Sequence, residues 1–179
     1  DITYISFAAK AKAMDKLFEE LGVAQQGRVA MVSHNASRML TFLFGTAAWG
    51  RIGVPINFRL NHEEISYIIE HSGAEVLIVD PELEDTLKEV KVKHFFCMGR
   101  DSDEVLFKAG EPTPWVPDED ATATINYTSG TTARPKGVEM THRMLWTNAA
   151  IFGWQTGVND RDVYSVSYTH LRAHETPLY

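Results

Sequence analysis

The sequence Ile125-Asn-Tyr-Thr-Ser-Gly-Thr-Thr-Ala-Arg-Pro-Lys-Gly-Val-Glu-Met-Thr-His142 places a run of hydroxyl side chains, a glycine and a lysine between two apolar segments. Residues 123–127 and 137–140 have the composition of strands, so the residues between them form a turn. Backbone N–H groups and hydroxyls in such a turn can converge on one anion, and Gly130 lets the backbone approach it closely. Lys136 adds a full positive charge on a segment that Pro135 restrains. The stretch therefore predicts an anion-binding loop.

The spacing of this loop differs from that of the Walker phosphate loop. After Gly130 and four intervening residues the chain reads Pro135-Lys136-Gly137, where the Walker pattern requires Gly-Lys-Ser/Thr. The loop instead resembles the signature of the adenylate-forming family, which includes acyl-CoA synthetases, luciferases and peptide-synthetase adenylation domains. That signature reads Tyr/Phe-Thr-Ser-Gly-Thr-Thr-Gly-x-Pro-Lys-Gly-Val, and Ala133 replaces its second glycine. Alanine takes positive φ less freely, so the loop is expected to be stiffer or differently bent there. The alternative is an ordinary Ser/Thr/Gly-rich turn of a surface hairpin.

The resemblance extends over residues 2–166. It is carried by the helix that follows Thr3-Tyr4 and by three further segments: Gly27-Arg-Val-Ala30, Gly53-Val-Pro-Ile-Asn-Phe-Arg-Leu60 and Ile68-Ile-Glu-His-Ser-Gly-Ala74. In the family the large N-terminal domain continues with adenine-binding and ribose-binding motifs, and a small C-terminal domain adds a second catalytic lysine. The chain is therefore expected to be a fragment of an AMP-binding (adenylation) domain. Residues 167–179 depart from the family and resemble translated sequencing-adapter sequence, so we predict a non-native tail.

The resemblance implies ATP-dependent activation of a carboxylic acid, first to an acyl-adenylate and then to an acyl-CoA. It implies ATP, Mg²⁺ and coenzyme A as cofactors, and a small carboxylic acid, of the fatty-acid branch, as substrate. Lys136 is the predicted catalytic residue; the predicted cofactor-binding residues are Thr128, Ser129, Gly130, Thr131, Thr132, Ala133, Arg134 and Lys136. No metal ligand is predicted within the chain, and the fragment alone is expected to be inactive. Two alternatives stay open: the adenylation domain of a peptide synthetase, and a non-catalytic nucleotide-binding module.

The composition of the chain limits its partners. The 179 residues are 44% hydrophobic and 23% charged, which is ordinary for a globular protein, and the net charge is −7. This charge argues against nucleic acid or an anionic membrane as the main partner. The most apolar run, Met39 to Trp49, is too short to span a bilayer. One cysteine, Cys97, and scattered histidines indicate neither a disulfide nor a zinc site. A cytoplasmic location is the default expectation.

Outside the loop the pattern alternates helices and strands. Helices are predicted over residues 4–21, 37–49, 61–73 and 82–90, and strands over 28–33, 54–56, 76–79 and 93–98. This order predicts an α/β fold with a mostly parallel sheet flanked by helices, a part of the large N-terminal domain of an adenylate-forming enzyme. Pro55 lacks an N–H, so its strand is predicted to be an edge or short strand. The helix over 37–49 is apolar nearly all round and is expected to be buried on both sides.

Residues that flank the loop carry further predictions. Residues 99–123 are expected to form a surface connection, whose acidic cluster, 118–120, is expected to be a solvated flank rather than a metal site. A helix capped by Thr141 is expected to bury Leu145, Ala149 and Phe152. His142, in its first turn, either contacts phosphate or is held by local packing. Arg134, Lys136 and Arg143 are expected to form a local basic patch.

Overall fold

The computed structural model describes residues 2–108, 110–128 and 134–162. Its elements, in order, are α1 (Tyr4–Glu20), β1 (Arg28–Ser33), α2 (Ser37–Ala47), β2 (Ile52–Asn57), α3 (His62–Ser72), β3 (Val76–Val79), the 3-10 turn η1 (Pro81–Leu83), α4 (Glu84–Leu87), β4 (His94–Cys97), α5 (Asp103–Leu106), β5 (Thr122–Thr128), β6 (Lys136–Thr141) and α6 (His142–Thr156). The chain divides into two compact units, Asp1–Arg143 and Met144–Tyr179. The predicted boundary at residue 166 and the predicted tail lie outside the described residues.

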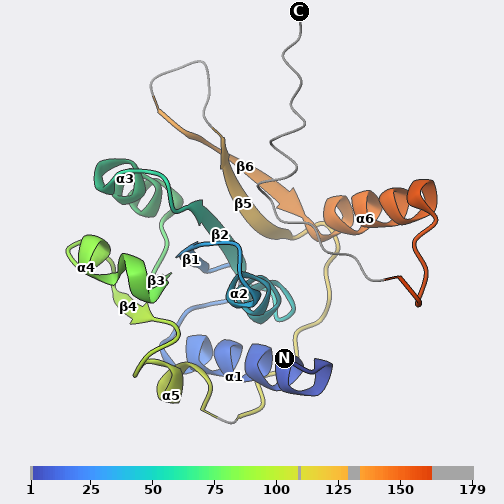
Figure 1. The fold of residues 1–179 in the computed structure, drawn as a ribbon, viewed down its shortest axis with the longest axis horizontal. Helices are drawn as coiled ribbons and strands as arrows, with labels where there is room; N and C mark the ends of the chain where they lie inside the picture. Colours follow the sequence, from blue (N-terminus) through green and yellow to red (C-terminus); the bar gives the residue numbers. More distant parts are fainter. Residues whose placement is uncertain (1, 109, 129–133, 163–179) are drawn as a thin grey trace, which may run out of the picture. The chain divides into compact units, whose positions relative to one another are not determined.

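A six-stranded sheet in the order β4-β3-β1-β2-β5-β6 forms the centre of the first unit (Figure 1). The first five strands in this order, β4, β3, β1, β2 and β5, run parallel to one another. The last strand, β6, runs antiparallel to β5. Each parallel connection carries the chain through a helix, as parallel strands require. The predicted fold class, a mostly parallel α/β sheet flanked by helices, is confirmed.

Helices cover both faces of this sheet. Alternate residues of β1 point to opposite faces, so Val29 and Met31 pack with α1, α2 and α5, while Ala30 and Val32 pack with α3 and α4. All four residues of β3 are buried for the same reason. The predicted helices α1 and α3 each bury an apolar face with helical spacing: Met14, Leu17 and Phe18 in α1, and Ile65, Ile68 and Ile69 in α3.

Of the two options predicted for the strand that contains Pro55, an edge strand or a short strand, the edge is excluded, because the six-residue strand β2 lies between β1 and β5. Ile52 donates its N–H to the Gly27 carbonyl, on the β1 side, at 2.9 Å. N–H groups alternate in direction along a parallel strand, so that of residue 55 would face β5. There the register between β2 and β5 consists of the pair Gly53–Thr124, and it ends before Pro55. The absence of an N–H at Pro55 therefore removes no hydrogen bond from the ladder between β2 and β5.

The helices differ from expectation mainly in length and exposure. Asn61 and Glu64 form a capping box at the start of α3, and Gly73, at a φ of 68°, ends the helix at the predicted boundary. In contrast, α2 is not buried on both sides, since Leu40 and Phe44 are each 55% exposed. The helix predicted over residues 82–90 is shortened to η1 and α4, and the predicted connection after residue 99 contains the short helix α5.

Helix α6 begins at His142, directly after Thr141, as predicted. The predicted burial of its apolar face is wrong, because no residue of α6 is buried, and Phe152 is 45% exposed. The spacing of apolar residues predicts which face of a helix would be buried, but it does not predict whether another element packs against that face. Among the helices that the structure describes, none combines the length and the hydropathy needed to cross a membrane.

Candidate functional site

The predicted loop joins the two strands of the β5–β6 hairpin. Thr128, the last residue of β5, is in register with Lys136, the first residue of β6, and both residues are exposed. The hairpin therefore fixes the spacing between the first predicted hydroxyl and the predicted catalytic lysine. The other predicted hydroxyl and small residues, Ser129, Gly130, Thr131, Thr132 and Ala133, lie outside the described residues.

Close packing next to Lys136 explains the glycine that follows it. Gly137 is in register with Tyr127 across the hairpin. A Cβ atom at Gly137 would lie 3.0 Å from Ile125 Cγ2 and 3.2 Å from Tyr127 Cζ. Since real Cβ contacts are rarely this short, a side chain at this position would push Tyr127 away. Gly137 thus allows the aromatic ring to lie across the strand beside Lys136.

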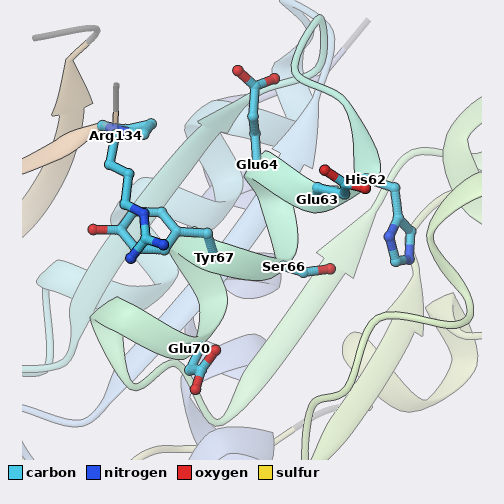
Figure 2. Close-up of a pocket in the computed structure, with 8 residues that line it drawn as sticks. His62, Glu63, Glu64, Ser66, Tyr67, Glu70 and Arg134 are labelled. Atoms are coloured by element: carbon cyan, nitrogen blue, oxygen red, sulfur yellow. The ribbon is translucent and has the colours of Figure 1, made fainter. Parts of the chain in front are cut away.

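Arg134 reaches from the hairpin to helix α3. Its Cζ atom lies 5.4 Å from the centre of the Tyr67 ring, within the range of a cation–π interaction, and Figure 2 shows the two side chains together. They line an open pocket between α3 and Pro135 that also contains Glu63, Glu64 and Glu70. Three carboxylates would repel a polyphosphate, so this pocket does not have the charge of a triphosphate site.

A second contact joins α3 to the other strand of the hairpin. His71 Nδ1 lies 2.8 Å from the Tyr127 hydroxyl, and the two rings meet edge to face at 5.8 Å. Burial raises the pKa of Tyr127, with the neighbouring Tyr67 adding to the effect, so the phenol is neutral near pH 7. Sequence reasoning missed Tyr67 and His71. The available signal was their i, i+4 spacing, which places both rings on one face of α3.

Two residues after the hairpin are engaged locally. The His142 ring lies 5.2 Å from that of Trp115, and burial lowers the pKa of His142, which favours a neutral imidazole held by packing. Arg143 forms ion pairs with Glu119, at 2.7 Å, and with Asp120, at 3.0 Å. The acidic cluster therefore neutralises Arg143 locally, and Arg143 does not combine with Arg134 and Lys136 into the expected basic patch.

A buried polar network lies at the carboxyl ends of β1 and β3. Asp80, which is fully buried, accepts hydrogen bonds from the Ser33 hydroxyl (2.9 Å), the His34 backbone N–H (2.8 Å) and Arg38 Nε (2.9 Å). Burial raises the pKa of Asp80, but these hydrogen bonds outweigh it and hold the pKa below its ordinary value. His34, Asp80 and Glu82 lie close enough to share a cation. Because Arg38 already neutralises Asp80, the network is a structural connection between β1, β3 and α2.

Comparison with known proteins adds to this geometry. The sequence matches the family of AMP-binding enzymes over residues 1–174. The chain therefore belongs to the AMP-binding enzyme family. A crotonobetaine/carnitine–CoA ligase of Salmonella paratyphi A is 32% identical over 180 residues, which cover 90% of this AMP-binding chain and 35% of the ligase. The chain thus spans about a third of the length of this curated relative.

Solved structures of AMP-binding relatives have the same fold. The N-terminal domain of FACL13 from Mycobacterium tuberculosis, bound to an inhibitor, is 30% identical with a TM-score of 0.74, over 89% of this chain and 42% of that one. The o-succinylbenzoate CoA synthetase of Bacillus subtilis, in complex with its acyl-adenylate intermediate, is 27% identical with the same TM-score of 0.74, over 90% of this chain and 42% of that one. The family predicted from the loop is confirmed.

Proposed function

We propose that this chain is part of an enzyme that activates a carboxylic acid with ATP and transfers the acyl group to coenzyme A. The observation that carries the proposal is the hairpin that sets Thr128 opposite Lys136 at the ends of a Thr-Ser-Gly-Thr-Thr loop. The named relatives, which include CoA ligases and a structure with a bound acyl-adenylate, support it. We also propose that the reaction takes place in the cytoplasm.

In the proposed reaction, a carboxylate oxygen attacks the α-phosphorus of ATP. The bond between that phosphorus and the bridging oxygen breaks, and pyrophosphate leaves with the electron pair. A thiolate then attacks the acyl carbon and AMP departs. The role of Lys136 belongs to the first step, since an ammonium aimed at the departing pyrophosphate stabilises charge that grows in the transition state. The loop backbone and hydroxyls orient the phosphates in line with the attacking oxygen.

Magnesium is the expected partner of the triphosphate. The described residues at the loop end, Thr128 and Arg134 to Lys136, include a hydroxyl but no carboxylate. Mg²⁺ prefers carboxylate and phosphate oxygens, so the ATP phosphates and a carboxylate from elsewhere in the enzyme would hold it. When bound, the ion would neutralise phosphate charge and so add to the effect of Lys136.

The Lys136→Ala variant of the full-length enzyme tests this role. We expect adenylation, measured as exchange of pyrophosphate into ATP, to slow by roughly 10²- to 10³-fold, the loss typical when one preorganised charge donor is removed. Thioester formation from supplied acyl-adenylate should change little. Thr128→Val should cost less, since a neutral hydrogen bond contributes about 0.5–1.5 kcal/mol.

The matched control is Lys88→Ala, which removes an exposed lysine whose ion pair with Asp85 lies on α4. Exposed pairs of this kind contribute little, so both half-reactions should keep their rates. An equal loss of both half-reactions in Lys136→Ala would contradict the proposed role.

The acid itself is the finer part of the proposal. We propose a fatty or related acid, because the loop and the segment around Pro55 resemble that branch. The relatives named above act on crotonobetaine or carnitine and on o-succinylbenzoate. Pyrophosphate exchange with a panel of aliphatic, betaine and aromatic acids tests this choice, and a maximal rate with an aromatic acid would contradict it. Replacing coenzyme A by a carrier protein as the thiol acceptor distinguishes the peptide-synthetase alternative.

A further inference from the structure

Helix α3 presents two aromatic side chains beside its buried isoleucine face, Tyr67, which packs against the edge of the core, and His71, which lies outside it. Tyr67 and His71 are one turn apart, and their rings lie 5.3 Å from each other. The isoleucines of the same helix are buried, whereas Tyr67 is half-buried and His71 is exposed. The isoleucines anchor α3 on the core, so the exposed parts of Tyr67 and His71 are free to contact a neighbouring segment.

This aromatic face contacts the hairpin on both sides of the predicted phosphate loop. His71 contacts Tyr127, the residue before Thr128, and Tyr67 contacts Arg134, two residues before Lys136. Figure 2 shows Arg134 extended from the hairpin to Tyr67 rather than toward the carboxylates of Glu64 or Glu70. One rigid helix therefore holds the residues that enter and leave the loop.

The two contacts restrict the residues that would grip phosphate. Pro135, with its fixed φ, stands between Arg134 and Lys136, so an arginine held on α3 limits the positions that the Lys136 backbone can take. Similarly, a hydrogen bond that fixes Tyr127 limits Thr128. Restriction before binding lowers the entropy cost of binding and improves alignment, which is the means by which positioning accelerates a reaction.

We propose that Tyr67 and His71 are positioning residues that hold both ends of the phosphate loop, and that Arg134 serves as an anchor on Tyr67 rather than as a phosphate ligand. This inference rests on the proposed function, since it assigns the loop's alignment to α3. The acidic pocket is consistent with this role, because the carboxylates of Glu63, Glu64 and Glu70 repel phosphate from the space beside the Arg134 side chain.

The experiment compares Tyr67→Leu with Tyr67→Phe in the full-length enzyme. Leucine removes the ring face, whereas phenylalanine keeps it and serves as the matched control. We expect Tyr67→Leu and Arg134→Gln each to lower kcat/KM for ATP in pyrophosphate exchange by roughly two- to fivefold, the strength of an exposed cation–π contact. The double variant should lose no more than either single variant, because both changes break the same contact. Tyr67→Phe should match the wild type, and thioester formation from supplied acyl-adenylate should be unchanged.

The second contact is tested by Tyr127→Phe, which removes only the hydroxyl opposite His71. We expect kcat/KM for ATP to fall by roughly two- to tenfold, as for one hydrogen bond. An unchanged value would overturn the role of His71.

Three results would overturn the role of Tyr67: equal activity of Tyr67→Leu and Tyr67→Phe, losses that multiply in the double variant, or equal loss in both half-reactions. A loss in Arg134→Gln much larger than that in Tyr67→Leu would make Arg134 a phosphate ligand and overturn its role as an anchor. Lys136→Ala separates this inference from the proposed function. If Lys136→Ala abolishes exchange while Tyr67→Leu is silent, only the positioning inference fails.

Discussion

Asp15 and Arg51 meet inside the protein, where only 1% and 5% of their surfaces are exposed. Arg51 Nη1 donates to Asp15 Oδ1, and Arg51 Nε donates to the Val23 carbonyl at 3.1 Å. Burial raises the pKa of Asp15 to about 6, although Arg51 opposes the rise. The carboxylate is therefore largely ionised near pH 7 and depends on Arg51 as its close counter-charge.

Removing one partner of this pair should cost much more stability than removing both. We expect Arg51→Met to lower the free energy of unfolding of the full-length enzyme by about 3–5 kcal/mol, because it leaves a buried charge uncompensated. The double variant Asp15→Leu/Arg51→Met should recover most of this loss. Denaturant titration of the single and double variants measures both values, and additive losses would show that the pair is not coupled.

The sequence predicted the positions of individual site residues best where these residues lie close together in the chain. The loop composition identified Thr128 and Lys136 as opposite ends of one turn, and the hairpin register confirms that placement. The partners Tyr67 and His71 could not be found this way. Their spacing shows that they share a helix face, but contact with Tyr127 is set by the packing of segments 56 residues apart.

At the scale of elements, the Asp80 network joins β1, β3 and α2 at the carboxyl edge of the sheet. Hydrogen bonds hold the folded-state pKa of Asp80 below its ordinary value of about 3.9. A depressed pKa means that the unfolded state takes up the proton first as pH falls. The carboxylate therefore contributes stability that is complete above the unfolded-state pKa and is lost as pH falls through the folded-state pKa.

The variant Asp80→Asn should remove this dependence on pH. We expect it to lower the midpoint of thermal unfolding at pH 7, where wild-type Asp80 is ionised and bonded. The difference from the wild type should shrink progressively below about pH 4, where Asp80 of the unfolded wild-type chain takes up a proton while the folded carboxylate is still ionised. Melting curves from pH 7 to pH 3 measure the difference, and a constant gap would assign the stability to other groups. Asp85→Asn, on the exposed surface, is the control.

The sequence predicted most helices and strands of the sheet from periodicity, but it did not predict which strands are neighbours. The capping box of α3 involves residues three apart in sequence, so the local sequence is sufficient to determine it. Strand order does not follow from local sequence. The chain forms β3 and β4 on the other side of β1 before β5 pairs with β2. The edge option predicted for Pro55 fails because only the side of β2 that faces β5 lacks a donor, and the ladder on that side ends at Gly53.

At the scale of the molecule, the chain spans about a third of its curated relative, and α6 has no buried residue. Trp146 is 72% exposed and Trp154 is 89% exposed. Large exposed aromatic side chains on one helix indicate an interaction surface. We expect the remainder of the full-length enzyme to cover α6, and the isolated chain to be inactive without it.

Tryptophan fluorescence tests this expectation. In the isolated chain of 179 residues, Trp154→Phe should remove a component that emits at long wavelength, as water-exposed indole does. In the full-length enzyme the same substitution should remove a component that emits at shorter wavelength and resists aqueous quenchers. Trp115→Phe, which replaces a half-buried ring, serves as the control. Equal quenching of Trp154 in both proteins would show that α6 stays uncovered.

The short junction between β2 and β5 has a consequence for how the sheet opens. Since the pair Gly53–Thr124 is the register that joins the hairpin to the parallel strands, β5 and β6 can separate from β1 to β4 with little loss of ladder bonds. Amide hydrogen exchange should then fall into two classes, slow in β1 and β3 and faster in β6. A nucleotide bound at the hairpin would selectively slow exchange of the β6 amides. The ligand would thus suppress opening of the hairpin, while the strands β1 to β4 stay paired with or without it.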